Sequence, residues 1–303
     1  MQIPENLIGA EWAFNRYEAI SDVLPSANFP REYKIVPDLS ALTETIDTFF
    51  LDAFGVLNVG EAAIPGAIER MTALRASGKG LLVVSNSATY PTPITAARYR
   101  KLGFDFSDEE VVSSRDALKV GLRNRPAIHW GVAASRASDI EELGVDAVLL
   151  ENDPSLYRDV EGFILLSSAQ WTDSQQNLLV DAIANNSRPV LVGNPDIVAP
   201  RETGLSLEPG FFAHDLATKT GCTPVFFGKP FPNIFALAID RADGIDLQRT
   251  AMVGDTLHTD VLGGAAALVQ TVLVTDHGLF AGTNVDPYIG RSLIVPDIVC
   301  GTT

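Results

Sequence analysis

The stretch TFFLDAFGVLNVG, residues 48–60, decides the fold. It begins with the apolar run TFFL, residues 48–51. A short unbroken run that is rich in phenylalanine indicates a strand that is buried on both faces. The run stops at Asp52, and a lone carboxylate at the end of a buried strand suggests a nucleophile or a metal ligand. Two residues later, where a second acid would share the same site, the chain has Phe54. The stretch is therefore either a catalytic strand with one part missing or a strand that only looks catalytic.

The alternation of strand and helix continues outward from this stretch. The runs KGLLVVSNS, PVFFGK, TAMVGD and TVLVTD indicate further buried strands, separated by segments with helical spacing. The helices have ordinary start and stop signals, as at Pro65 and Gly78 of PGAIERMTALRASG. Near-continuous apolar strands that alternate with helices imply a parallel sheet covered on both faces. We therefore expect an α/β fold with a doubly wound, Rossmann-like parallel sheet.

The middle of the chain, residues 115–221, indicates a second α/β unit inserted into the first. Its strands are AIHWGV, DAVLLE, GFILLS and PVLVGNPD, and TDSQQNLLVDAIANN is a helix between the last two. The first unit is then discontinuous, with residues 45–114 and 222–303, and PVFFGK belongs to its sheet. Residues 1–44 form a helical extension, in which NLIGAEWAFNRYEAISDVL has helical spacing and prolines follow.

Composition narrows the class of protein. The chain has 303 residues, 46% of them hydrophobic and 20% charged, which is typical of a globular protein with two domains. Its net charge of −16 repels phosphate backbones and anionic lipids, so we expect neither a nucleic-acid nor a membrane partner. No apolar run has the length of a bilayer span, and the first residues lack the pattern of a signal peptide. Two widely separated cysteines fit a reducing compartment, so we expect a cytoplasmic protein.

Polar residues follow four of the predicted strands at the point where each apolar run ends. Each of them alone would be an ordinary cap or turn residue. Sites in open α/β sheets form beyond the carboxyl ends of the strands, so four such ends on one sheet indicate a functional site. The residues are Asp52, the pair Ser85 and Asn86, Lys229, and Asp255 with Asp260 five positions further on.

The segments DAFGVL, VVSNS, GKP and GDTLHTD resemble, in this order, the four motifs of the haloacid-dehalogenase (HAD) superfamily of hydrolases. IPGA, NPD and GKPFPNIFALA are similar to its NagD-like subclass (class IIA), in which a C2-type cap domain is inserted between the second and third motifs. The resemblance covers about residues 48–275. It implies a phosphatase-type hydrolase of small phosphorylated metabolites, because a large cap excludes macromolecules. Caps of this class often form dimers, so a homodimer through the cap is implied by the resemblance alone.

The resemblance also implies the catalytic residues. Asp52 would be the nucleophile that becomes an acyl phosphate, Lys229 would neutralise the reacting charges, and Ser85 would bind a phosphoryl oxygen. Mg²⁺ suits such a site, because it is bound by a few carboxylates and keeps water and phosphate oxygens as its other ligands. The implied metal ligands are Asp52, Asp255, Asp260 and the backbone carbonyl of Phe54.

Four further residues are implied as contacts of the substrate. Gly55 and Asn86 would lie at the phosphoryl group, and Asn194 and Asp196 of the GNPD segment would reach the leaving group from the cap. For the GNPD pair, an ordinary Asx-Pro turn after a strand is an equally good interpretation. His258, a candidate for a replacement acid between Asp255 and Asp260, is expected to face solvent.

Phe54 stands where phosphatases of this family have the aspartate that protonates the leaving group and then activates water. Phenylalanine can do neither, and positioned acid–base catalysis is worth roughly 10²–10⁴ in rate. We therefore expect an enzyme that is slow or selective for good leaving groups. Two alternatives stay open at this point. One is a metal-free dehalogenase-like hydrolase, although GDTLHTD keeps both metal-site acids, and the other is a non-catalytic regulatory protein that binds phosphate.

Overall fold

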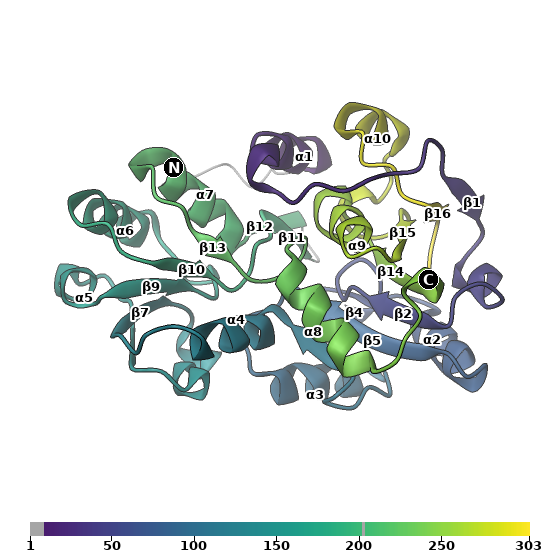
Figure 1. Cartoon of the computed structure of the whole chain (residues 1–303), viewed down its shortest axis with the longest axis horizontal. Coiled ribbons are helices and arrows are strands. Elements are labelled where there is room, and N and C mark those ends of the chain that lie inside the picture. Colours follow the sequence, from purple (N-terminus) through teal and green to yellow (C-terminus); the bar gives the residue numbers. More distant parts are fainter. Residues whose placement is uncertain (1–8, 202–203) are drawn as a thin grey trace.

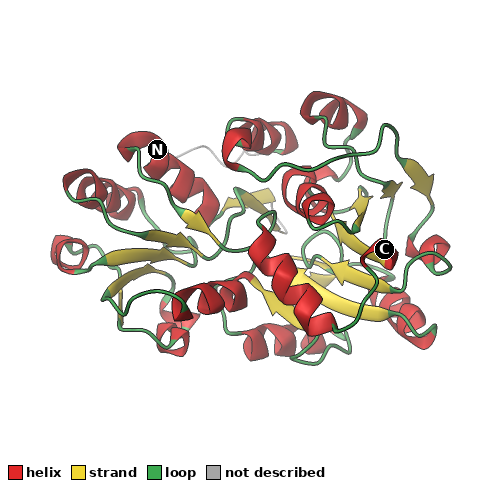
Figure 2. Cartoon of the chain, in the orientation of Figure 1, coloured by secondary structure: helices red, strands yellow, loops and turns green. Residues whose placement is uncertain are grey.

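The computed structural model describes residues 9–201 and 204–303. Within them, two parallel sheets lie side by side, and helices cover both faces of each (Figures 1 and 2). The larger sheet has seven strands in the order β1-β16-β15-β14-β2-β5-β6. Every adjacent pair of these strands is parallel. The bounds are β1 Lys34–Val36, β2 Thr48–Leu51, β5 Gly80–Ser85, β6 Val111–Ser113, β14 Thr250–Gly254, β15 Gln270–Val274 and β16 Ile298–Cys300.

The second sheet has five parallel strands in the order β13-β10-β9-β7-β8. Its strands are β7 Trp130–Ala133, β8 Ala147–Leu149, β9 Gly162–Leu165, β10 Val190–Val192 and β13 Val225–Phe226. The predicted α/β class with a doubly wound parallel sheet is thus confirmed. Below, the seven-stranded sheet with its helices is called the core unit, and the five-stranded sheet with its helices is called the cap unit. The domain bounds 45–114, 115–221 and 222–303 stay predictions.

One strand lies in a different sheet from the one expected. PVFFGK was assigned to the core sheet, but β13 pairs with β10 and extends the cap sheet. A short apolar run shows that a strand is buried without showing which sheet it joins, because either edge can bury the same side chains. Lys229 therefore reaches the site from a segment that leaves the cap sheet, and not from the end of a core strand.

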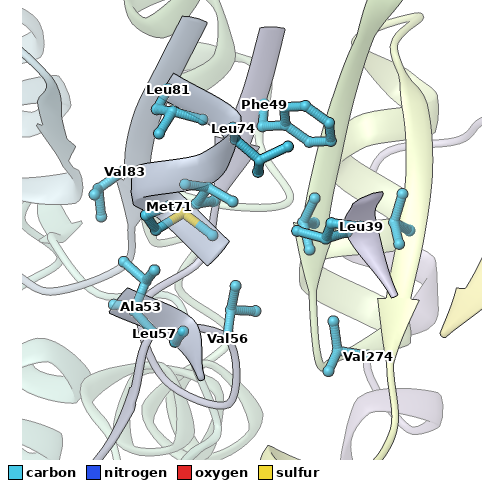
Figure 3. Close-up of a cluster of buried hydrophobic side chains, with 14 of the residues drawn as sticks. Leu39, Phe49, Ala53, Val56, Leu57, Met71, Leu74, Leu81, Val83 and Val274 are labelled. Carbon is cyan, nitrogen blue, oxygen red and sulfur yellow. The ribbon is translucent and has the colours of Figure 1, made fainter. Parts of the chain in front are cut away.

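Side chains of successive residues in the core strands point to opposite faces and build two hydrophobic clusters. Phe49, Leu51 and Val83 pack with α2 and α3 in one cluster, part of which is drawn in Figure 3. Phe50 and Val84, one position away, pack with α4 and α8 in the other. The helices are α2 Ala67–Ala76, α3 Thr92–Leu102, α4 Ser114–Arg123, α5 Pro154–Asp159, α6 Asp173–Asn185, α7 Pro209–Thr220, α8 Pro232–Ala242, α9 Leu262–Ala266 and α10 Asp286–Ser292.

Two antiparallel hairpins project near the carboxyl ends of the core strands. One is β3 (Asn58–Val59) with β4 (Ala62–Ala63), directly after the Asp52 segment. The other is β11 (Val198–Arg201) with β12 (Gly204–Leu207), which follows the GNPD segment of the cap unit. Among the described residues, no helix combines the length and the apolar character that crossing a bilayer requires.

The described part of the N-terminal extension is more than a helix. Its helix α1 (Ala10–Glu18) lies between α7 of the cap unit and α10 of the core unit (Figure 1). After a loop, β1 joins the edge of the core sheet beside β16. The helix was expected from its spacing, whereas the strand was not, because KIV is too short a run to show a strand. Residues 1–8, including the first three residues of the predicted helical segment, lie outside the described residues.

Candidate active site

Lys229 joins two carboxylates at the carboxyl ends of the core strands. Its Nζ lies 2.7 Å from Oδ1 of Asp52 and 2.7 Å from Oδ1 of Asp260. Asp52 comes directly after β2, and its backbone N–H donates to the carbonyl of Val253 near the end of β14. The sheet therefore fixes the position of the Asp52 segment. The side chains of Lys229 and Asp260 are almost completely buried, and that of Asp52 is 14% exposed. The acid that ends the buried strand is thus paired with the lysine, as the motif order implied.

Asp255 completes a group of three acids. One carboxylate oxygen from each of Asp52, Asp255 and Asp260 lies within 4.8 Å of the others. Asp255 follows β14, and a single π-helical turn, Leu257–Val261, brings Asp260 back toward the strand end. The backbone N–H of Thr256 donates to Oδ2 of Asp260 at 3.1 Å. Three oxygen ligands that converge in this way match what a hard divalent cation prefers.

The electrostatics of the acids point the same way. Burial raises the pKa of Asp255 to about 8, and the neighbouring Asp260 and Asp52 add to the shift. Burial also raises the pKa of Asp52 to about 6, although the ammonium group of Lys229 opposes it. Burial alone would lower the pKa of Lys229, but Asp260 and Asp52 outweigh it and raise that pKa above its usual range. One lysine thus leaves the negative charge undercompensated, and the donor set fits Mg²⁺.

Two glycines permit this arrangement. Gly55 has a φ of +80°, and an added Cβ would lie 2.7 Å from Cβ of Asp255. Gly278 has a φ of +76°, and an added Cβ would lie 1.9 Å from Oδ2 of Asp255. Beside it, the backbone N–H of Leu279 donates to the same oxygen at 2.6 Å. The Gly278 segment was missed from the sequence, because a glycine-leucine pair after a strand has no distinctive motif. Gly55 was implied as a substrate contact, and the structure places it against the Asp255 side chain.

Ser85 ends β5 and Asn86 follows it, at the same edge of the sheet. Oδ1 of Asn86 accepts from the backbone N–H of Lys229 at 2.7 Å and from the hydroxyl of Ser114 at 3.1 Å. Its Nδ2 donates to the carbonyl of Lys229 at 2.9 Å and to Oδ1 of Asp196 at 2.7 Å. Asn86 thus holds the lysine segment in place with both ends of its amide. The hydroxyl of Ser85 is buried and accepts from the backbone N–H of Ser87 at 3.2 Å.

The GNPD segment of the cap unit contacts the core unit through Asp196. Asn194 forms the turn that its sequence allowed, because its Oδ1 accepts from the backbone N–H of Asp196 at 2.9 Å. Its Nδ2 donates to Glu208 at 3.2 Å, so the side chain is engaged within the cap unit. Burial raises the pKa of Asp196 well above its ordinary value, with Asn86 and Lys229 opposing the shift. The side chain of Asn194 thus stabilises an Asx-Pro turn within the cap unit, whereas the side chain of Asp196 contacts Asn86 at the site.

Phe54 lies beside the site at the rim of the core cluster and is partly buried. Arg201 of the β11–β12 hairpin places its guanidinium 5.4 Å from the centre of the Phe54 ring. Nε of Arg201 donates to Ser206 at 2.8 Å, and Nη2 donates to Glu208 at 2.8 Å. No pattern in the sequence indicates this arginine, because it lies in a cap hairpin about 150 residues away along the chain.

The expectation that His258 faces solvent is wrong. Its side chain is 2% exposed, and its Nε2 lies 2.7 Å from Oε1 of Glu18 in α1. Its ring stacks on that of Tyr17 with centroids 5.2 Å apart and an interplanar angle of 9°. Burial lowers the pKa of His258, with Glu18 opposing the shift. The error arose because the covering residues come from the N-terminal extension, which local spacing around His258 does not reveal.

Comparisons with known proteins identify the family to which the chain is similar. A sequence model of the family described as haloacid dehalogenase-like hydrolase matches residues 49–146, and a second, described as HAD-hydrolase-like, matches residues 226–298. The human glycerol-3-phosphate phosphatase is 28% identical over 288 residues, which cover 85% of this chain and 88% of that protein.

Solved structures of similar fold cover between 78% and 89% of the chain. A possible sugar phosphatase of the HAD superfamily from Cytophaga hutchinsonii has a TM-score of 0.78 at 26% identity, covering 89% of this chain and 98% of that one. A glycerol phosphate phosphatase from Mycobacterium tuberculosis, in complex with calcium, has a TM-score of 0.64 at 25% identity and covers 78% and 68%. NagD from E. coli shares the fold, with a TM-score of 0.67 at 23% identity and coverages of 85% and 97%. The chain therefore belongs to the haloacid-dehalogenase superfamily and is a hydrolase of its phosphatase type.

Proposed function

We propose that this protein is a Mg²⁺-dependent phosphohydrolase of small phosphorylated metabolites, in which Asp52 forms an aspartyl phosphate. The observation that carries the proposal is the contact of Lys229 with Asp52 and Asp260, at 2.7 Å each, beside the third acid Asp255. One oxygen of Asp52, the carboxylates of Asp255 and Asp260 and the backbone carbonyl of Phe54 would hold the ion. Asp52 would attack with its other oxygen. The ion would supply positive charge to the phosphoryl oxygens.

In the first step, a carboxylate oxygen of Asp52 attacks phosphorus, and the bond from phosphorus to the leaving-group oxygen breaks. The electron pair of that bond departs with the leaving group. Lys229 stabilises the charge that accumulates on the phosphoryl oxygens, because it is buried and already fixed by Asn86. Ser85 is proposed to bind one of these oxygens.

In the second step, water attacks the phosphorus of the acyl phosphate, and the bond to the Asp52 oxygen breaks. Inorganic phosphate leaves, and the Asp52 carboxylate returns. At the position that would give a proton in the first step and take one in the second, the chain has Phe54. We therefore propose that the enzyme is slow on alkyl phosphates and prefers leaving groups that depart without a proton, such as aryl and acyl phosphates.

A parallel assay separates this proposal from its alternatives. Phosphate release from p-nitrophenyl phosphate and halide release from a haloacid are measured over a series of Mg²⁺ concentrations and with EDTA. The proposal expects phosphate release that rises with Mg²⁺, stops with EDTA and is lost in Asp52→Asn. Halide release independent of Mg²⁺ would instead indicate a dehalogenase. Phosphate binding without turnover of any ester would indicate a regulatory protein.

A further inference from the structure

Helix α1 of the N-terminal extension contacts both units of the molecule. On the cap side, the ring of Trp12 lies 5.9 Å from that of Phe211 in α7. On the core side, Arg291 of α10 bonds to the carboxylate of Glu11 at 2.9 Å and lies over the ring of Phe14. The buried face of α1 belongs to one cluster that holds residues of both units. The helix therefore spans the boundary between cap unit and core unit, as its place in Figure 1 shows.

Tyr17 is the residue of α1 that touches both sides of the active site. Its hydroxyl oxygen accepts from the backbone N–H of Ile197 at 3.1 Å, directly after Asp196. Its ring stacks on His258, which lies in the π-helical turn between Asp255 and Asp260. The side chain is 3% exposed, so both contacts are shielded from water.

A short chain of contacts leads from Tyr17 to the catalytic lysine. Ile197 follows Asp196, and Asp196 accepts from Nδ2 of Asn86 at 2.7 Å. The same amide accepts from the backbone N–H of Lys229 through its Oδ1. If the Ile197 segment became more mobile, the segment that carries Lys229 would also become more mobile, because two hydrogen bonds of Asn86 connect them.

We propose that Tyr17 is a positioning residue: it fixes the cap loop at Asp196 relative to the metal-site turn, and thereby fixes Lys229 against Asp52. This rests on the proposed phosphohydrolase function. It assigns the extension a part in the active site, although none of the extension's described residues, from 9 onward, contacts the reacting atoms. The effect should fall on kcat, because Lys229 acts on the charge of the transition state, and KM should change little.

Tyr17→Phe tests the proposal, since it removes one hydroxyl and keeps the stacked ring. The matched control is Tyr33→Phe, the same change in the same extension, where the hydroxyl donates to Asp286 of α10. With p-nitrophenyl phosphate and saturating Mg²⁺, Tyr17→Phe should lower kcat about fivefold, the value of one hydrogen bond, with KM within about twofold. Hydrogen exchange of the amides of residues 194–201 and 204–208 should also become faster. Tyr33→Phe should match the wild type in both measurements.

An unchanged kcat in Tyr17→Phe, with exchange no faster than in Tyr33→Phe, would overturn the proposal. A lower melting temperature with unchanged kcat would also overturn it, because that is the result of a purely structural role. If Tyr17→Phe does not fold, Trp12→Leu tests the same helix at its other cap contact, with the same expected results. A wild type without phosphatase activity would reject the proposed function. Hydrogen exchange does not depend on turnover, so it would still decide whether Tyr17 holds the cap loop.

Discussion

The guanidinium of Arg201 lies 5.4 Å from the centre of the Phe54 ring, so a cation of the cap unit stacks on the residue that stands two positions after Asp52. Phe54 replaces the aspartate that phosphatases of this family have at this position, and its ring also contacts Arg201 of the cap unit. In the proposed mechanism, the side of the site from which the leaving group departs then has an aromatic ring and a positive charge in place of a carboxyl group.

Phe54→Asp should open turnover of alkyl phosphates. A carboxyl group at this position can protonate the leaving alkoxide and then activate water, which is worth roughly 10²–10⁴ in rate. The gain should be smaller for p-nitrophenyl phosphate, whose leaving group needs no proton. Steady-state kinetics on a sugar phosphate and on p-nitrophenyl phosphate measure both effects, with Phe54→Leu as the apolar control. Equal gains on both substrates would show that proton donation to the leaving group was not limiting, and a gain in Phe54→Leu would show an effect unrelated to acid–base catalysis.

Arg201→Gln should raise KM for substrates whose leaving group carries a second negative charge, such as a phosphorylated hydroxy acid. Loss of one charge-assisted contact corresponds to about tenfold, and KM for p-nitrophenyl phosphate should change much less. Arg201 is 42% exposed and the described residues give hydrogen-bond partners to its Nε and Nη2 only. The control is Arg98→Gln, since Arg98 is 40% exposed and also lies 5.4 Å over a ring, that of Tyr90. If both variants behave alike, Arg201 has no part in selecting the substrate.

Gly278→Ala should weaken Mg²⁺ binding, because the new methyl group would overlap the Asp255 carboxylate, at 1.9 Å from Oδ2. Gly282 also has a positive φ, +72°, but an added Cβ there meets no described heavy atom within 4 Å. Gly282→Ala therefore shares the backbone strain, about 1–2 kcal/mol, without the overlap. Isothermal titration with Mg²⁺ should show a loss of about tenfold or more in affinity for Gly278→Ala alone. Equal affinities in the two variants would mean that Asp255 does not bind the ion.

The metal-free protein should lose stability as pH rises from about 4 to 8. Burial raises the pKa of Asp52 from 3.8 to about 6 and that of Asp255 from 3.8 to about 8. A carboxyl group whose pKa is raised by folding stabilises the folded state below its unfolded pKa, and this contribution is lost as pH rises through the folded pKa.

Melting temperatures measured across this range, with EDTA and with Mg²⁺, check the expectation. The fall should be clear with EDTA and small with Mg²⁺, because the ion compensates the ionised carboxylates. Asp255→Asn should flatten the upper half of the EDTA curve. A wild-type EDTA curve that is level from pH 4 to 8 would contradict the pKa shifts.

Much of the site could be predicted from the sequence, for a physical reason. Parallel strands end at one edge of a sheet, so acids that follow apolar runs, such as Asp52 and Asp255, are brought together by the fold itself. Asp260 was also predicted, because it is only five positions after Asp255, and the turn Leu257–Val261 brings it back to the end of the same strand. Lys229 was singled out in the same way, as a residue that follows an apolar run, and the ordered motifs implied its role, although the strand before it joins the cap sheet.

Two of the contacts that were missed join distant parts of the chain. Tyr17 and Glu18 cover His258 across about 240 residues, and Arg201 meets Phe54 across about 150. Neither contact leaves a periodicity or a spacing in the sequence, because each depends on how a finished element packs on another. The role of Asn194 could not be decided for the related reason that a turn and a substrate contact need the same residue type.

The most direct test of the account is a rapid-quench measurement of the first turnover of p-nitrophenyl phosphate with Mg²⁺. Because Phe54 cannot activate water, the acyl phosphate should break down more slowly than it forms. The account predicts a burst of p-nitrophenol close to one equivalent per enzyme, with acid-quenched protein carrying phosphate on Asp52. A linear time course without a burst, and no phosphate on Asp52, would contradict it.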